Sequence, residues 1–174
     1  MTNLLILILI WFCALGCAVL GGLYFAFSVF IMKALEQVGP AGIVAMNSIN
    51  VMILRSLVMP IFFTTTLASA LLAVVGFVEI HQPRGAYLAA GGIVYVAGMF
   101  LVTIIFNVPL NNALAVGGEA NWTRYLTSWT TWNHVRTLSC VVAAALFIIA
   151  LKKAPEVAPE ATRTTRSEPP SLLR

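Results

Sequence analysis

Charged side chains are scarce in this chain, and aspartate is absent altogether. Only 9% of the 174 residues are charged, whereas 60% are hydrophobic. Soluble domains average about 25% charged and 45–50% apolar residues. So little polar surface cannot cover a water-soluble particle, and the composition therefore excludes an all-aqueous enzyme. The length allows one domain or one small bundle.

Common metal and cofactor motifs are also missing. The three cysteines, Cys13, Cys17 and Cys140, form no CxxC pair and stand beside no histidine, so we interpret them as small apolar fillers. The sequence contains no phosphate-binding glycine loop and no nucleophile elbow. We therefore predict no metal and no cofactor, although a haem held by a single histidine stays open.

Basic side chains are few and dispersed in the apolar body. Residues 1–151 contain five of them, Lys33, Arg55, Arg84, Arg124 and Arg136, and the other Lys and Arg residues follow Leu151. No run of basic residues could form a nucleic-acid footprint, so we expect no nucleic-acid partner.

Long apolar segments dominate what is present. The segment from Leu4 to Met32 carries no charge and exceeds the roughly 30 Å hydrocarbon core when helical. Its length and the lack of a preceding basic residue favour a membrane helix over a cleaved signal. Further apolar segments cover 56–79, 86–107 and 128–151. We predict an all-α, antiparallel four-helix transmembrane bundle as one domain, residues 1–151.

Breaks in the pattern mark the connections between these helices. Residues 33–54 are interpreted as a short re-entrant or interfacial segment broken at Gly39-Pro40. Pro109 predicts an end or a kink in the third helix near Asn107. Gly117-Gly118 predicts another break, followed by an interfacial turn over 119–127. Residues 152–174, rich in Pro, Glu, Thr, Arg and Ser, are expected to be a disordered tail.

The distribution of basic residues predicts the orientation. With four spans, both termini and the 81–85 turn share one side, which holds six basic residues against four on the other. This bias favours an integral protein of the plasma or inner membrane with both termini in the cytoplasm.

Four spans also bring the 1–2 and 3–4 connections to one face of the membrane. Most polar residues of the body lie there, including Asn47, Asn50, Asn107, Asn111, Trp122, Trp129, Trp132, Asn133, His134 and Arg136. We expect any functional site to lie at this face of the membrane. Two plainer interpretations stay open: loops are simply polar, and the tryptophans form an interfacial belt.

Arg136 is the most informative residue of this group. It lies about 22 Å along a helix from Leu151, which places it inside the hydrocarbon core. A buried arginine costs at least ~2.5 kcal/mol unless it is paired or reaches water, so it either snorkels outward or points into a polar pocket. Helical spacing puts Trp129, Asn133 and Cys140 on its face, and His134 about 160° away.

A second polar element surrounds Pro109. Proline frees a backbone carbonyl near the end of the third helix, and Asn107 and Asn111 add amide donors and acceptors there. Such an arrangement lines a cavity for a polar group or simply caps a helix terminus. Asn47 and Asn50 offer further amides at the same face.

Two motifs in these segments resemble a known family. Asn107-Val108-Pro109-Leu110-Asn111 followed by Trp129 to Thr137, which contains Trp132-Asn133-His134-Val135-Arg136, is similar to the anthrone-oxygenase-like membrane family over roughly residues 5–150. The resemblance implies four transmembrane helices. It also implies, by analogy, cofactor-independent oxidation of an anthrone to an anthraquinone by O₂.

Such a reaction requires a stabilised enolate and a base. Arg136 could stabilise the anion, with Asn107, Asn111 or Asn133 bonding its oxygen. His134 has a suitable intrinsic pKa, and Glu36 and Glu119 are further candidates for the base.

Three hypotheses follow. The first is an oxygenase or related redox enzyme acting on an apolar aromatic or quinone-like molecule from the bilayer. The second is a non-catalytic binder of lipid, quinone or pigment, or an accessory subunit of a membrane complex. A transporter is third, although small multidrug pumps depend on a carboxylate in their first helix and Leu4–Met32 has none. The glycine-rich helix faces also permit a homo-oligomer.

Overall fold

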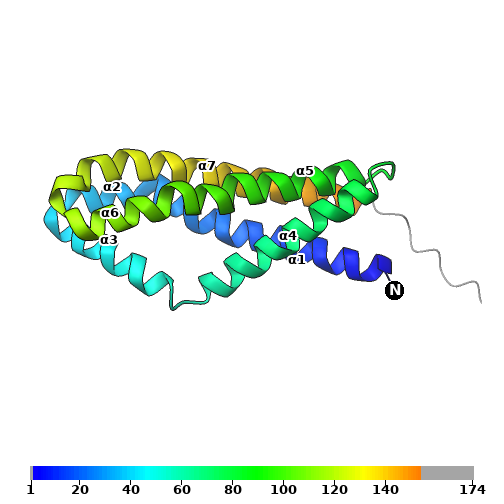
Figure 1. Ribbon diagram of the computed structural model, residues 1–174, viewed down its shortest axis with the longest axis horizontal. Coiled ribbons are helices and arrows are strands. Elements are labelled where there is room, and N and C mark those ends of the chain that lie inside the picture. The colour runs from blue at the N-terminus through cyan, green and yellow to red at the C-terminus, as the bar shows by residue number, and fades with distance from the viewer. Residues whose placement is uncertain (1, 154–174) are drawn as a thin grey trace, which may run out of the picture.

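Four long apolar helices lie side by side in the computed structural model, which describes residues 2–153 (Figure 1). The spans that are long and apolar enough to cross a membrane are Leu4–Gln37, Val58–Val78, Gly85–Gly117 and Glu119–Lys152. This confirms the predicted all-helical fold with four membrane spans. The expected tail falls almost wholly on residues 154–174, which lie outside the described part of the chain.

The described residues form ten helical elements. They are α1 (Thr2–Ala26), η1 (Phe27–Ile31), α2 (Met32–Gln37), α3 (Pro40–Ile53), α4 (Val58–Val78), α5 (Gly85–Tyr95), η2 (Val96–Leu101), η3 (Thr103–Asn107), α6 (Val108–Gly117) and α7 (Glu119–Lys152). Nine of them make up the four spans and one, α3, lies between the first two spans. The three η elements are π-helical, a geometry that is rare and frequent at functional sites.

Neighbouring helices in the bundle run antiparallel. Helix α1 packs against α7 and α4, and α5 packs against α4 and α7. A buried core fills the centre between them, with Cys17, Leu72, Leu88, Cys140 and Phe147 almost fully enclosed. The N-terminus and the end of α7 lie at one end of the bundle, whereas α2, α3 and α6 gather at the other (Figure 1). The two connections expected at one face are thus found together.

The fourth helix is longer than predicted. We expected an interfacial turn over 119–127 and a helix from about 128, but α7 begins at Glu119, directly after Gly118. No glycine or proline interrupts residues 119–152. Trp122 and Tyr125 continue the buried stripe of α7 and pack in a second core cluster with Met46 and Leu114. This burial extends the helix beyond the membrane-spanning length.

The third helix also continues past its predicted end. Pro109 was expected to end or kink it near Asn107, yet α6 follows η3 without a break and runs to Gly117. The N–H of Val108 bonds to the Thr103 carbonyl, five residues back. Because proline at the first or second position of α6 follows this wider turn, its missing N–H does not stop the helix.

Residues 33–54 are more regular than an interfacial loop. The first helix extends to Gln37, and the chain then turns at Gly39, whose φ of +59° suits glycine. From Pro40 it forms α3, which packs against α2, α6 and α7. The expected break at Gly39-Pro40 is present, but the helix of 14 residues that follows was not predicted.

Candidate functional site

A cavity of about 400 Å³ lies between the polar end of the bundle and the start of α4. Its walls come from every one of the four spans and from α3. The polar side chains that line it are Tyr24, Asn47, Asn50, Thr103, Asn111, Asn112, Trp129 and Arg136. We call it the Arg136 cavity. Its volume falls in the range of small-molecule sites.

One wall of the Arg136 cavity is apolar and reaches the protein surface. Its residues there are Val51, Leu54, Phe63, Ile104 and Val108, all of them exposed. Most belong to membrane spans, so in a membrane this side faces hydrocarbon.

Arg136 stands at the inner end of the cavity and is only 4% exposed. One terminal nitrogen donates a hydrogen bond to Asn133 Oδ1, and the other donates to Thr103 Oγ1 at 3.4 Å. The guanidinium carbon lies 4.2 Å from the centre of the Tyr24 ring and 5.1 Å from that of Trp129. Arg136 therefore points into the bundle rather than snorkelling outward.

The charge of Arg136 is not neutralised by a carboxylate. In the described chain, the salt bridge that forms is Arg84 with Glu79 at the opposite end of the bundle, and no acid lies within ion-pair distance of Arg136. The Arg136 Nε also has no hydrogen-bond partner among these residues. A buried cation held only by amide, hydroxyl and ring groups is available to an anion that enters the cavity.

Asn133 fixes the position of the guanidinium. Its Nδ2 donates to the Tyr24 carbonyl oxygen and to Ser28 Oγ, both at 2.7 Å, while its Oδ1 accepts from Arg136. Asn133 is fully buried behind the cavity wall. Because its amide is engaged on both sides, this residue positions Arg136 and has no free group to offer a ligand.

Asn107 and Asn111 occupy different positions around the same site. Asn107 is buried and donates from Nδ2 to the Trp129 carbonyl at 3.3 Å, and it does not line the cavity. Asn111 does line the cavity, and its Oδ1 accepts a hydrogen bond from the Tyr125 hydroxyl at 2.8 Å. Tyr125 does not itself line the Arg136 cavity, but it stacks on Trp129, which does, with ring centroids 5.7 Å apart.

The candidate bases lie elsewhere. His134 is exposed on the side of α7 opposite to Arg136, and Glu36 and Glu119 are exposed near the helix ends. No carboxylate or imidazole is found among the described residues that line the cavity. Within residues 2–153 there is also no group of three or more His, Cys, Asp and Glu side chains placed to hold a metal ion.

Sequence reasoning missed Tyr24, Ser28 and Thr103. Each is a hydroxyl residue inside a long apolar span, which is the signal that could have found it. Ser28 and Thr103 belong to the π-helical segments η1 and η3, and Tyr24 lies one turn before η1. Their partners, Asn133 and Arg136, are distant in sequence, so only the packing of the helices shows the contacts.

Comparison with known proteins gives one match. Neither the curated proteins nor the solved structures contain a match to this chain. Residues 49–146, more than half of the chain, match the anthrone oxygenase family. The matched region includes Thr103, Asn111, Trp129 and Arg136, so it covers much of the cavity wall. The chain is a helical membrane protein that belongs to the anthrone oxygenase family.

Proposed function

We propose that the Arg136 cavity binds an apolar aromatic carbon acid of the anthrone type and that the protein catalyses its oxidation by O₂. The observation that carries this proposal is a buried guanidinium that has no carboxylate partner among residues 2–153, at the inner end of a cavity whose outer wall is apolar. Family membership supports the same reaction class. The substrate reaches the site from the bilayer.

The reaction needs an acidic CH₂ group that is conjugated with a ketone through aromatic rings, as in an anthrone. Loss of one proton to a water molecule gives an enolate, whose oxygen lies against the Arg136 guanidinium and is stabilised there. The enolate carbon then forms a bond to O₂, and the resulting peroxide anion takes a proton back from water. Loss of the second C–H proton with cleavage of the O–O bond leaves a new ketone and releases one water molecule. One oxygen atom ends in the product and the other in water, and the CH₂ carbon supplies all four electrons.

The remaining side chains have supporting roles in this proposal. Asn111 lines the cavity and bonds a second oxygen of the substrate, while Asn133 holds Arg136 in place. Asn107 supports the backbone of Trp129 from behind. Because no described lining residue is a carboxylate or imidazole, Arg136 acts chiefly by making the bound carbon acid more acidic.

No residue with a carboxylate or an imidazole lines the cavity within the described part of the chain, and this favours one alternative. A protein that only binds a quinone, pigment or lipid needs an apolar cavity and a polar anchor, but it needs no group that accepts a proton. Binding without turnover would leave O₂ consumption at its background rate, so the same assay separates the two functions.

The test is O₂ uptake by the purified protein in detergent, with a panel of anthrones and hydroquinones. Arg136→Ala should lower turnover roughly 10²–10³-fold, as expected for loss of an oxyanion-stabilising group. Arg166→Ala, in the C-terminal segment, is the matched control and should change nothing. Equal turnover in both variants, each with wild-type helical content, would remove Arg136 from the reaction. If the wild type consumed no O₂ with any compound of the panel, the binding function would be favoured.

We further propose that both termini face the cytoplasm of a plasma or inner membrane, as the distribution of basic residues favours. Glu119 and Lys153 lie at opposite ends of α7 and are both exposed. In intact cells, a membrane-impermeant maleimide should label Glu119→Cys and not Lys153→Cys. The reverse pattern would invert the orientation.

A further inference from the structure

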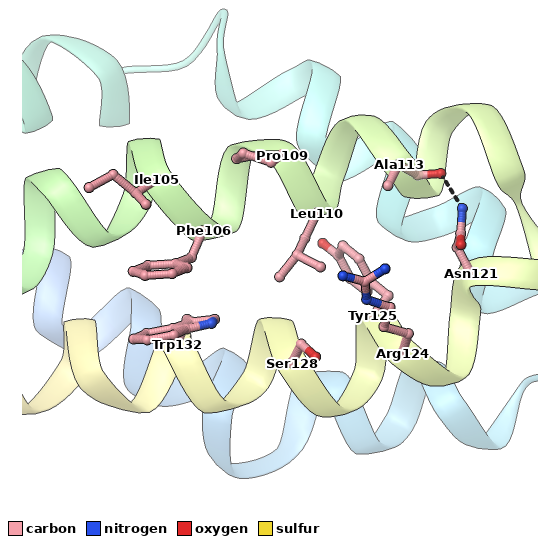
Figure 2. Close-up of a pocket in the computed structure, with 10 residues that line it drawn as sticks. All are labelled: Ile105, Phe106, Pro109, Leu110, Ala113, Asn121, Arg124, Tyr125, Ser128 and Trp132. Carbon is pink, nitrogen blue, oxygen red and sulfur yellow. Dashed lines mark hydrogen bonds between the residues drawn. The ribbon is translucent and has the colours of Figure 1, made fainter.

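A second hollow of about 270 Å³ lies on the outside of the bundle, in the furrow between α6 and α7 (Figure 2). It shares no lining residue with the Arg136 cavity. On the α6 side and in η3 its wall is apolar and includes Ile105, Pro109 and Leu110. On the α7 side, the Arg124 side chain points into the furrow at one end, and Trp132 lies at the other end (Figure 2).

Arg124 is an exposed cation that has no partner in the described part of the chain. No described residue forms an ion pair or a hydrogen bond with it, and no acid is found among the described residues that line the furrow. The nearby amide of Asn121 is already engaged, because its Nδ2 donates to the Ala113 carbonyl at 2.8 Å (Figure 2). The furrow therefore presents one positive charge that is free to bind an anion.

The position of Arg124 along α7 identifies its membrane environment. From Arg124 to Lys152 the helix rises about 42 Å, which equals the full thickness of a bilayer including both headgroup layers. With Lys152 and Lys153 at the headgroups of one leaflet, Arg124 lies at the headgroups of the other. Trp132 lies about 12 Å deeper than Arg124 and faces acyl chains.

Three residues of α7 follow one another on the face toward the furrow at intervals of one turn. Arg124, Ser128 and Trp132 supply a cation, a hydroxyl group and an aromatic surface in this order from the membrane surface inward. Trp132 is stacked on Phe106 with ring centroids 3.6 Å apart, which makes a flat, rigid wall. A phospholipid has its phosphate, its ester carbonyls and its acyl chain in the same order and at similar spacing.

We propose that this furrow is a binding site for a phospholipid of net negative charge. The Arg124 guanidinium binds the phosphate through two N–H donors. The Ser128 hydroxyl donates to an ester carbonyl, and an acyl chain lies along Leu110 and the Phe106–Trp132 pair. Since no acid is found among the described residues that line the furrow, no carboxylate there pairs with the cation of a zwitterionic headgroup, and net anionic lipids are preferred.

The experiment uses quenching of tryptophan fluorescence in the full chain, solubilised in detergent. Phosphatidylglycerol with brominated acyl chains should quench at a concentration roughly five- to tenfold lower than brominated phosphatidylcholine. Arg124→Gln should abolish this difference. Arg55→Gln, which removes an exposed arginine outside both cavities, should preserve it.

A further variant shows where the lipid lies. Trp132→Phe should remove the component of quenching that phosphatidylglycerol produces at low concentration. Equal quenching by the two lipids in the wild type, a lipid preference that survives Arg124→Gln, or low-concentration quenching that survives Trp132→Phe would each overturn the proposal.

Discussion

The guanidinium carbon of Arg136 lies 4.2 Å from the centre of the Tyr24 ring, so a cation in α7 rests on an aromatic face of α1. The Asn133 side chain links the same two residues, because it accepts a hydrogen bond from the Arg136 side chain and donates one to the Tyr24 carbonyl. An aromatic face attracts a cation without neutralising it. The pair thus holds a positive charge inside the bundle and leaves it available to a ligand.

The ring of Tyr24 should matter more for activity than its hydroxyl. The hydroxyl makes a long contact of 3.9 Å with Met99 Sδ and also interacts with the Arg136 side chain, so Tyr24→Phe should lower kcat/KM by less than Tyr24→Leu. Tyr24→Leu removes the ring and should lower kcat/KM about five- to thirtyfold, corresponding to ~1–2 kcal/mol of cation–π interaction. O₂ uptake measures both variants. Equal activities of the two would show that the ring does not support Arg136.

Narrowing the cavity near its apolar side should affect binding more than chemistry. Met59 lines the Arg136 cavity near the start of α4, and Met59→Trp should raise KM for the aromatic substrate roughly tenfold, with kcat little changed. Leu67→Trp is the control, because Leu67 is exposed on the same helix and lies outside the cavity. An unchanged KM in Met59→Trp would argue against this cavity as the substrate site.

His134 should be dispensable. Its side chain is exposed and does not line the Arg136 cavity, so we expect His134→Gln to keep the turnover number and the pH profile of the wild type. The measurement is kcat by O₂ uptake from pH 5 to 9. A loss of turnover in a protein with wild-type helical content would instead assign the base to His134.

Close contact between α4 and α5 depends on Gly92. A β-carbon at this position would collide with the Ser69 carbonyl and with Ala73 of α4. Gly92→Val should therefore lower the free energy of unfolding by about 1–3 kcal/mol, the usual cost of overpacking. Gly22→Val is the control, since a β-carbon at Gly22 meets no atom within 4 Å. Unfolding by a denaturing detergent measures both, and equal midpoints would contradict the prediction.

Much of the fold follows from the sequence, because the bilayer constrains it strongly. Long uncharged segments predicted the four spans, and the number of spans alone predicted that the two polar connections lie at one end. The spacing of Trp129, Asn133, Arg136 and Cys140 placed them on one face of a helix, and all four are buried there. The ends of the helices were predicted less well, because burial of Trp122 and Tyr125 extends α7 beyond the membrane-spanning length.

The sequence by itself therefore determined a four-helix membrane protein, and it left open whether Arg136 snorkels outward or points into a polar pocket. Only the tertiary structure decided which groups surround that arginine, namely Tyr24, Thr103 and the amide of Asn133. The physical reason is that the lipid-facing and core-facing sides of a membrane helix are both apolar. The pattern of hydrophobic residues then contains little information about the rotation of each helix, and this rotation selects the residues that meet in the cavity.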